Sequence, residues 1–297
     1  MPVIVTTAVD LSRVDTSIVI QISSFLGTSR ELLNLALTCK SFGWRQPAST
    51  LNWSLVEEVA RQAVCSNATD GEMSSLPQHV GGTTTWLSIL HRFEHPLIFD
   101  VLLGGGIEHR NGNLSKVYGT GDGYVCTAVS SHCVMRLGAH YAEFQIAGEP
   151  WIGIVRPMPN LDAGAYQEGG FDFISVTDDH PSFVNKRSDD WGDSDVHACE
   201  INTMNGRMGW TNWVDGDIQG VEWEGMEECQ SGDTVGLLLN LNDGTLTVYR
   251  NNRRLGVMKN GLSGSYCWHT VVVGSDVDEE KDAVAIHRGT LPTVNNM

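Results

Sequence analysis

Basic residues are scarce in this chain of 297 residues: 19 Lys and Arg stand against 36 Asp and Glu, which gives a formal net charge of −17. A chain with so few cations neutralises few phosphates, so the balance argues against nucleic acid or an anionic membrane as a main partner. The acidity either serves solubility alone or offers an acidic face to a basic peptide or protein. Both interpretations stay open at this point.

Long apolar runs and paired cysteines are missing as well. The longest apolar stretch near the N-terminus, residues 18–22, is far too short to cross a bilayer, and no secretory leader pattern precedes it. The seven cysteines are scattered and contain no C-x-x-C pair. This pattern favours buried free thiols in a reducing compartment over a disulfide framework. We therefore expect a cytoplasmic or nuclear protein without a membrane partner.

The most regular segment is residues 232–257, GDTVGLLLNLNDGTLTVYRNNRRLGV. It begins with an apolar run, and Gly244 lies in a turn sequence that tolerates positive φ. After this turn comes a stretch of alternating apolar and polar residues. The turn residues Asn251 and Asn252 follow it and lead into a further short strand-like run. The pattern predicts a meander of three antiparallel strands. We expect it to form a rigid wall of the fold, so that Leu238→Asp unfolds the domain.

The first third of the chain has helical periodicity. Thr28 and Glu31 form a capping box, which predicts a helix that starts there. A helix over residues 18–26 is predicted before it, and two more are predicted near residues 55–64 and 86–93, the last ended by Pro96. The leucines and phenylalanines of residues 25–37 exceed what a unit of about forty residues can bury. They either pack against the rest of the protein or form a docking surface.

From Leu97 the period of the apolar pattern changes from 3.6 to 2. Strands are expected at residues 98–103, 140–146, 151–155, 267–273 and 283–287, with possible strands at 171–176 and 197–204, while 209–223 reads as irregular. Turn sequences recur about every ten residues, which indicates a mainly β fold, an antiparallel two-sheet sandwich. The predicted domains are a helical motif at 10–48, a helical linker region at 49–96 and the β-sandwich at 97–292.

Residues 18–44, IVIQISSFLGTSRELLNLALTCKSFGW, resemble an F-box. That motif continues from an apolar helix into D/E-L-L-x-L-x-x-x-C-K/R-x-F/W, which Leu32, Leu33, Leu35, Cys39 and Phe42 match; the Leu-Pro that usually opens it is absent. The resemblance implies binding to the small adaptor of a cullin–RING ubiquitin ligase. The implied contact residues are Phe25, Leu26, Leu32, Leu33, Leu35 and Phe42.

The β-rich part resembles a SPRY domain. The motifs that carry this resemblance are GAHYAEFQI at 138–146, WIGIV at 151–155, the 232–257 segment and LSGSYCW at 262–268. The family implies a bent β-sandwich that is not an enzyme and binds peptides or proteins with the loops at one edge. No cofactor or metal is implied.

Four of the nine tryptophans lie in one loop-rich stretch, residues 191–223. These residues either plug the ends of the sandwich or form an aromatic recognition surface, since Trp, Tyr and Arg supply most of the binding energy at interfaces. The second interpretation predicts that Trp213→Ala weakens partner binding and leaves the fold intact. The candidate contact residues on the sandwich are Arg156, Tyr166, Trp191, Trp210 and Trp213.

Four motifs suggest other chemistry. His91 and His95 lie in H-x-x-E-H, an inverted zinc-protease motif, although Pro96 ends the helix that would hold them. The 119–123 segment GTGDG lacks the Lys-Ser/Thr ending of a phosphate loop and predicts a turn. The acidic run 189–195 departs from the spacing of a calcium loop. His197 and Cys199 alternate on one strand with no fourth zinc ligand in evidence, which favours core packing.

These observations support three hypotheses. The first is a substrate-recognition adaptor of a cullin–RING ligase, whose helices bind the F-box-binding adaptor and whose sandwich binds a target protein or peptide. The second is a SPRY-type binding protein without a ligase role, whose N-terminal helices pack on the sandwich. The third, weakly supported, is a metallohydrolase that uses His91 and His95.

Overall fold

The computed structural model describes residues 26, 28–38, 40–44, 53–67, 85–121, 123–215, 218–225, 227–275 and 281–289. The predicted helix over 18–26, including Phe25, falls almost wholly outside these residues. The chain divides into two compact units between Pro96 and Leu97. Among the described residues, no helix is both long and apolar enough to cross a membrane.

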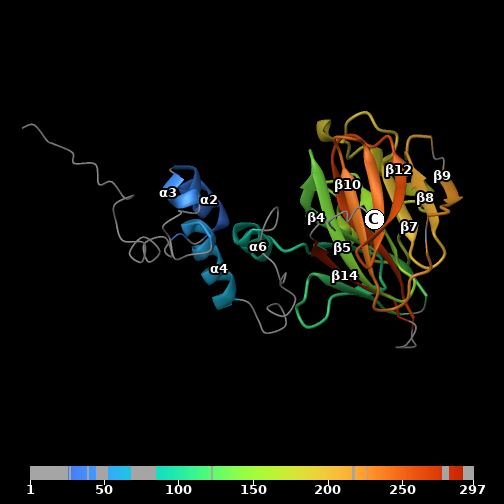
Figure 1. Cartoon of the computed structure of the whole chain (residues 1–297). Coiled ribbons are helices and arrows are strands. Elements are labelled where there is room, and N and C mark those ends of the chain that lie inside the picture. The colour runs from blue at the N-terminus through green and yellow to red at the C-terminus, as the bar shows by residue number, and fades with distance from the viewer. Residues whose placement is uncertain are drawn as a thin grey trace, which may run out of the picture. The chain divides into compact units, whose positions relative to one another are not determined.

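The first unit is helical (Figure 1). Its helices are α2 (Ser29–Thr38), α3 (Lys40–Gly43), α4 (Leu55–Asn67) and α6 (Trp86–Glu94). The capping box predicted at the start of α2 is present: the Thr28 amide donates to the Glu31 carboxylate over 3.1 Å, and the Glu31 amide donates to the Thr28 hydroxyl over 3.2 Å. The predicted positions of α4 and α6 are also confirmed.

Apolar side chains of all four helices form a core of their own. Its buried members are Leu32, Phe42, Leu55, Val56, Val59, Ala60, Val64, Ile89 and Leu90. Two carboxylates fasten the helix starts to neighbouring helices, because unpaired N–H groups at a helix N-terminus attract negative charge. Glu57 accepts from the Trp86 amide at the start of α6, and Glu94 accepts from the Ser29 amide at the start of α2. The unit is therefore held together by internal packing and internal caps.

The second unit is a sandwich of two antiparallel sheets with seven strands each, as predicted (Figure 1). The first sheet has the order β1-β4-β13-β6-β7-β8-β9, and the second has the order β12-β11-β10-β5-β14-β3-β2. The strands are β1 (Val101–Leu103), β2 (Ile107–Glu108), β3 (Lys116–Gly119), β4 (Val125–Met135), β5 (Ala139–Ala147), β6 (Trp151–Val155), β7 (Ala198–Asn202), β8 (Arg207–Thr211), β9 (Ile218–Glu222), β10 (Thr234–Asn240), β11 (Thr245–Arg250), β12 (Arg253–Asn260), β13 (Tyr266–Val273) and β14 (Ala283–Arg288).

The predicted meander is β10, β11 and β12, which pair in sequence order. Gly244 has φ of 65°, and Asn251 and Asn252 have φ of 47° and 65°, so both turns use the left-handed conformations that their residues tolerate. Leu237 and Leu239 are fully buried between the sheets, whereas Leu238 is half-buried on the other face. The expectation that Leu238 is the critical core position is therefore misplaced by one residue, because successive side chains of a strand point to opposite faces.

Two predicted secondary-structure assignments need correction. Residues 171–176 form no strand, since Asp172 caps a turn there through the Ile174 amide, 2.9 Å away. The stretch 209–223 is not irregular, because it holds most of the β8–β9 hairpin.

The sandwich has two apolar cores. One lies between the sheets and includes Phe144, Leu237 and Trp268. The other includes Phe173, Phe183, Trp191 and Trp213 packed on Val155 and Cys267 of the first sheet. The segment over this second core contains only short helical elements: η2 (Ala163–Tyr166), η3 (Thr177–Asp179), α7 (His180–Val184) and η4 (Asp189–Trp191). Residues 157–191, which we call the cover, thus pack on the first sheet.

Candidate functional site

A pocket of about 220 Å³ opens where this cover meets the first sheet. Its walls are mostly apolar, and its polar groups are two hydroxyls, a guanidinium pair and one carboxylate. The lining residues are Val101, Val129, Ser131, Val134, Arg136, Arg156, Pro157, Met158, Pro159, Leu161, Phe173, Ser188, Asp190 and Cys267. They come from β1, β4, β13 and the cover, so the pocket requires segments that are far apart in the sequence.

Two exposed charges face each other at the pocket. The Arg136 guanidinium lies 3.2 Å from the Asp190 carboxylate, and both side chains are about half exposed. An exposed pair of this kind contributes little to stability, typically below about 1 kcal/mol. Both charges can therefore be redirected to a bound partner without a large cost in folding.

Arg156 lies against the pocket from inside the fold and is only 1% exposed. Its guanidinium donates to the carbonyl oxygens of Ser263, Ser265 and Ser194 over 2.8, 3.1 and 3.1 Å, and it lies over the Tyr266 ring at 4.1 Å. Burial lowers the pKa of Arg156 to about 10. Arg156 is therefore buried rather than exposed, and it ties together three segments around the pocket that it lines.

Trp191 and Trp213 are buried, at 0% and 1% exposure, which corrects the expectation that they contact a partner directly. Each donates its indole N–H to a backbone carbonyl of a pocket-lining residue. Trp191 donates to Pro157 over 2.8 Å, and Trp213 donates to Phe173 over 2.9 Å. A buried indole needs such an acceptor. The two tryptophans thus hold the pocket wall from behind.

The remaining candidates, Tyr166 and Trp210, do not line the pocket. Tyr166 is half-buried, packs its ring 4.9 Å from that of Phe171 and shares a hydrogen bond of 3.3 Å with Ser182. Trp210 is half-buried on β8, with the Lys259 ammonium 3.9 Å from its ring centre. The structure therefore does not bring Arg156, Tyr166 and the tryptophans together as one recognition surface.

The F-box-like residues divide between the interior and the surface of the helical unit. Leu32 and Phe42 are buried in its core, and Leu26 and Leu35 are partly buried against it, so these four are not the free docking face that was expected. Leu33 is 46% exposed, and Phe25 lies outside the described residues. Leu37, one of the leucines of residues 25–37 for which a docking surface was considered, is 75% exposed, and Trp44, which was not predicted as a contact residue, is 66% exposed.

The nucleophiles near the pocket are not set up for acyl transfer. Ser131 donates to Asp100 over 2.6 Å, and the His132 Nδ1 atom lies 3.3 Å from the same carboxylate, so the carboxylate rather than the imidazole receives the serine proton. A catalytic triad needs the imidazole between the other two groups. Burial raises the pKa of the Cys267 thiol to about 12, which keeps it protonated. The lining thus offers groups for binding.

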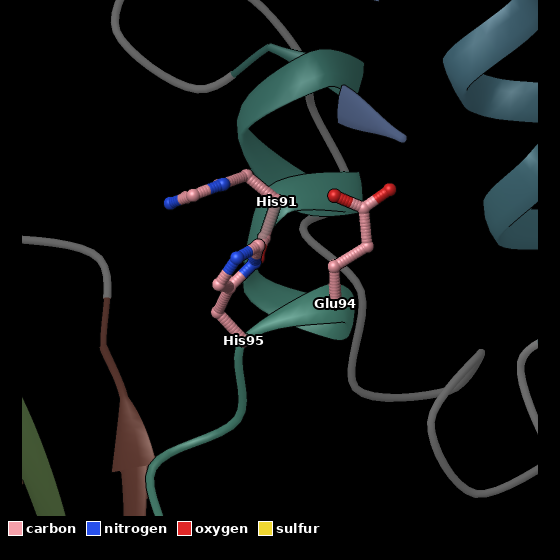
Figure 2. A group of neighbouring side chains, drawn as sticks. All are labelled: His91, Glu94 and His95. Carbon is pink, nitrogen blue, oxygen red and sulfur yellow. The ribbon is translucent and has the colours of Figure 1, made fainter. Parts of the chain in front are cut away.

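His91, Glu94 and His95 do gather at the end of α6 (Figure 2), and one potential ligand atom of each lies within 4.8 Å of the others. The two imidazole ring centres lie 4.5 Å apart, and Figure 2 shows both rings on one side of α6 and the Glu94 side chain on the other. The Glu94 carboxylate accepts from the Ser29 amide and hydroxyl, and the Ser29 hydroxyl lies 3.2 Å from the His91 Nδ1 atom. The group that would act as general base in H-x-x-E-H is therefore committed to capping α2.

The other motifs have structural roles in the described residues. The glycine-rich segment leads from β3 into β4, and Gly121 and Gly123 both have φ of 78°, as a turn requires. The acidic run begins as η4, and its Asp190 pairs with Arg136. His197 directly precedes β7 and Cys199 lies on it; both are buried, which agrees with core packing.

Sequence reasoning missed the pocket itself. One local signal was present: Pro157, Met158 and Pro159 begin one residue after the end of the buried strand β6, which marks a stiff apolar loop there. Nothing local marks Val101, Val129 or Cys267 as its neighbours, because only the register of β1, β4 and β13 brings them together.

No protein-family model and no curated protein matches the chain. Solved structures with a similar backbone include three SPRY domains. The SPRY domain of human HERC1 shares 12% identity, with 65% of this chain and 92% of that chain covered and a TM-score of 0.38. A human SPRY domain shares 14%, with 62% and 98% covered and a TM-score of 0.38. The PSpry domain of TRIM65 shares 10%, with 72% and 100% covered and a TM-score of 0.39. Likeness at this level carries no argument about partners.

Proposed function

We propose that this chain is a SPRY-type protein-interaction module that acts as a substrate-recognition adaptor of a cullin–RING ubiquitin ligase. The sandwich binds a target protein or peptide at the pocket, and the helical unit binds the F-box-binding adaptor. The bond-forming chemistry belongs to the partner enzyme, and this chain contributes proximity between enzyme and target.

The pocket is the observation that carries target binding. Its volume of about 220 Å³ lies below the range of roughly 300–1,000 Å³ that is usual for small-molecule sites. It fits an apolar anchor side chain of a peptide, which is how a few buried residues supply most of the energy of an interface. Arg136, Asp190 and Ser188 surround the apolar walls with groups that pair with a peptide backbone.

The motifs that resemble a SPRY domain now have places in the fold. The 138–146 motif forms β5, the 151–155 motif forms β6, and the 232–257 segment forms the meander. β5 pairs directly with β10 of the meander. These paired strands provide a rigid scaffold on which the cover can present a binding site.

The helical unit supports the ligase role through its exposed apolar side chains. Leu33 and Leu37 are one turn apart on α2, and Trp44 follows α3 with the Lys40 ammonium 5.2 Å from its ring. Leu32 and Phe42 belong to the core of the unit. Leu33, Leu37 and Trp44 lie outside this core and are available to contact a partner. A cluster of exposed large apolar residues is typical of a docking surface.

Target binding is tested by selecting peptides from a random library with the intact chain. Met158→Glu places a charge in the pocket wall, and we expect it to weaken binding of a selected peptide at least about tenfold. Met204→Glu, at an exposed methionine outside the pocket, is the matched control. Equal binding by both variants contradicts the pocket as the target site.

The ligase role is tested with the purified F-box-binding adaptor. We expect the intact chain to bind it and the Leu33→Glu, Leu37→Glu double variant to lose binding, while Leu114→Glu, at an exposed leucine of the sandwich, keeps it. Absence of binding by the intact chain rules out the ligase role and leaves target binding untouched.

That result would support the alternative of a SPRY-type binding protein without a ligase role. One observation favours this alternative: Leu32 and Phe42, two of the residues that carry the F-box resemblance, serve the internal core of the helical unit.

A further inference from the structure

β9 is the last strand of the first sheet and pairs along one side only, with β8. All five of its residues are exposed. Its pairing with β8 runs in unbroken register from Ile218 to Glu222, so the strand is straight enough to accept a further neighbour. Within the described part of the chain, its outer edge of N–H and C=O groups has no strand beside it.

This edge lacks the usual protection against strand pairing. Edge strands are commonly blunted by lysine, proline or a β-bulge. β9 has none of these, and two of its five side chains, Ile218 and Val221, are large, apolar and 45% exposed. Val214, just before the strand, is 62% exposed. The edge therefore has the features of a strand acceptor.

The two exposed side chains lie on opposite faces of the sheet. Val221 is directly opposite Met208, which is buried in the core between the sheets, so Val221 continues that core at its rim. Ile218 is opposite Thr211 and lies on the other face. A strand added beside β9 would extend both faces, and its alternate residues would contact Val221 and Ile218 in turn.

The charge around β9 selects the partner. Residues 214–229 contain six Asp and Glu and no Lys or Arg. Among the described acids of this stretch, Glu227 forms ion pairs with Arg250 and Arg253. A second copy of β9 would bring two acidic edges together, which like-charge repulsion disfavours. A basic segment matches the edge in charge.

We propose that the outer edge of β9 binds an extended basic segment of a partner protein by strand addition. Backbone hydrogen bonds supply the affinity, and an alternation of Lys or Arg with β-branched residues supplies the fit to the acidic, partly apolar edge. The inference rests on the proposed protein-binding function but uses a surface separate from the pocket.

The test uses the intact chain and a fluorescent peptide of about ten alternating Lys and Val residues, capped at both ends, with fluorescence polarisation as the measurement. We expect binding that weakens as salt is added. Ile218→Lys with Val221→Lys should lower the affinity at least about tenfold. Leu114→Lys with Leu137→Lys, at two exposed leucines outside β9, is the matched control and should change it little.

A second peptide separates strand addition from charge attraction. Methylation of every backbone nitrogen removes the N–H donors of both peptide edges, so that no intact edge can face β9, and it keeps all charges. We expect this peptide to lose binding; equal binding overturns strand addition. The proposal is also overturned if the intact chain forms a dimer and the Ile218→Lys, Val221→Lys variant is a monomer. That result would assign the edge of β9 to a second copy of the chain. Met158→Glu should leave this binding unchanged, so failure here and failure of the pocket remain distinguishable.

Discussion

Trp213 donates its indole N–H to the carbonyl oxygen of Phe173 over 2.9 Å, and the centres of the two rings lie 5.9 Å apart. Phe173 lines the pocket, and Trp213 itself does not. Trp213 also contacts Trp191, whose indole supports Pro157 on another part of the wall. The tryptophans therefore act on the pocket through its backbone, from within the second core.

Replacing Trp213 should act on stability first. We expect Trp213→Ala to reduce the free energy of unfolding by about 3–5 kcal/mol, since it removes a fully buried aromatic side chain. Trp213→Phe keeps most of the packing and should cost less, chiefly the hydrogen bond to Phe173, about 1–2 kcal/mol. Urea unfolding followed by circular dichroism measures both. Val214→Ala, at the exposed neighbour, is the control and should stay within about 0.5 kcal/mol. Unchanged stability in Trp213→Ala with weakened partner binding would restore the surface role.

Two glycines with the same backbone conformation should respond differently to alanine. Gly261 and Gly264 have φ of 77° and 78°. A Cβ atom at Gly261 meets nothing within 4 Å, whereas one at Gly264 would lie 1.9 Å from the carbonyl oxygen of Trp191. Gly261→Ala should cost only the left-handed strain, about 1–2 kcal/mol.

Gly264→Ala adds a clash between two backbone segments and should cost at least about 2 kcal/mol more. The flanking Ser263 and Ser265 carbonyls bind Arg156, so the same change should also disturb the pocket. Paired thermal and urea unfolding curves decide the point. Equal destabilisation by the two substitutions would show that the cover shifts to make room.

Acid should weaken the sandwich through its buried histidines. Burial lowers the pKa of His269 and of His197 to about 4, against about 6.5 in an unfolded chain. Between these values the unfolded state binds more protons than the folded state, so stability falls as the pH decreases from about 6.5 to about 4. For His269, which is fully buried, the loss amounts to about 3 kcal/mol at most.

The measurement is the free energy of urea unfolding at a series of pH values. His269→Gln removes one titrating group and should flatten the pH dependence in this window. Glu200 lies near His269 and contributes with the opposite sign: burial raises its pKa well above the usual value, so its contribution to stability falls as the pH rises above about 4.5. A His269→Gln profile that is parallel to that of the unchanged protein contradicts the assignment.

The elements that the sequence predicted well are those whose signals are local. The meander has turn residues at each reversal, and α2 has both halves of its capping box within four residues. The change of period at Leu97 marked the start of the β-rich part, and the two-sheet architecture followed from the turn sequences that recur about every ten residues after it. These signals need no knowledge of the rest of the fold.

The contact residues of the site were predicted poorly because their exposure depends on contacts between segments that are far apart in the sequence. Whether Trp213 is exposed depends on where the cover lies, and the cover packs on the sheet through contacts of high sequence separation such as Trp213 with Phe173. Likewise, the 3.6-residue period of a helix puts Leu32 and Leu33 on different faces of α2, but only tertiary packing makes Leu32 internal and Leu33 external. The tryptophans stood out by their number in one stretch of the sequence. That number does not show whether they support the pocket wall from within or contact a partner directly.

Neighbouring leucines on β10 give a direct test of the sandwich register. Leu237 is fully buried, with Ala142 and Val248 as its cross-strand neighbours, whereas Leu238 is half-buried on the opposite face beside Tyr141 and Thr247. Leu237→Asp places a carboxylate in the core between the sheets without a partner, and we expect a loss of more than about 4 kcal/mol, enough to unfold a domain of ordinary stability. Leu238→Asp leaves its carboxylate in contact with water and should cost about 1–2 kcal/mol. Soluble expression and near-ultraviolet circular dichroism distinguish the two variants, because only a packed sandwich gives a fixed aromatic signal. Loss of that signal in Leu238→Asp but not in Leu237→Asp would mean that β10 is shifted by one residue, which would turn every side chain of the meander to the other face.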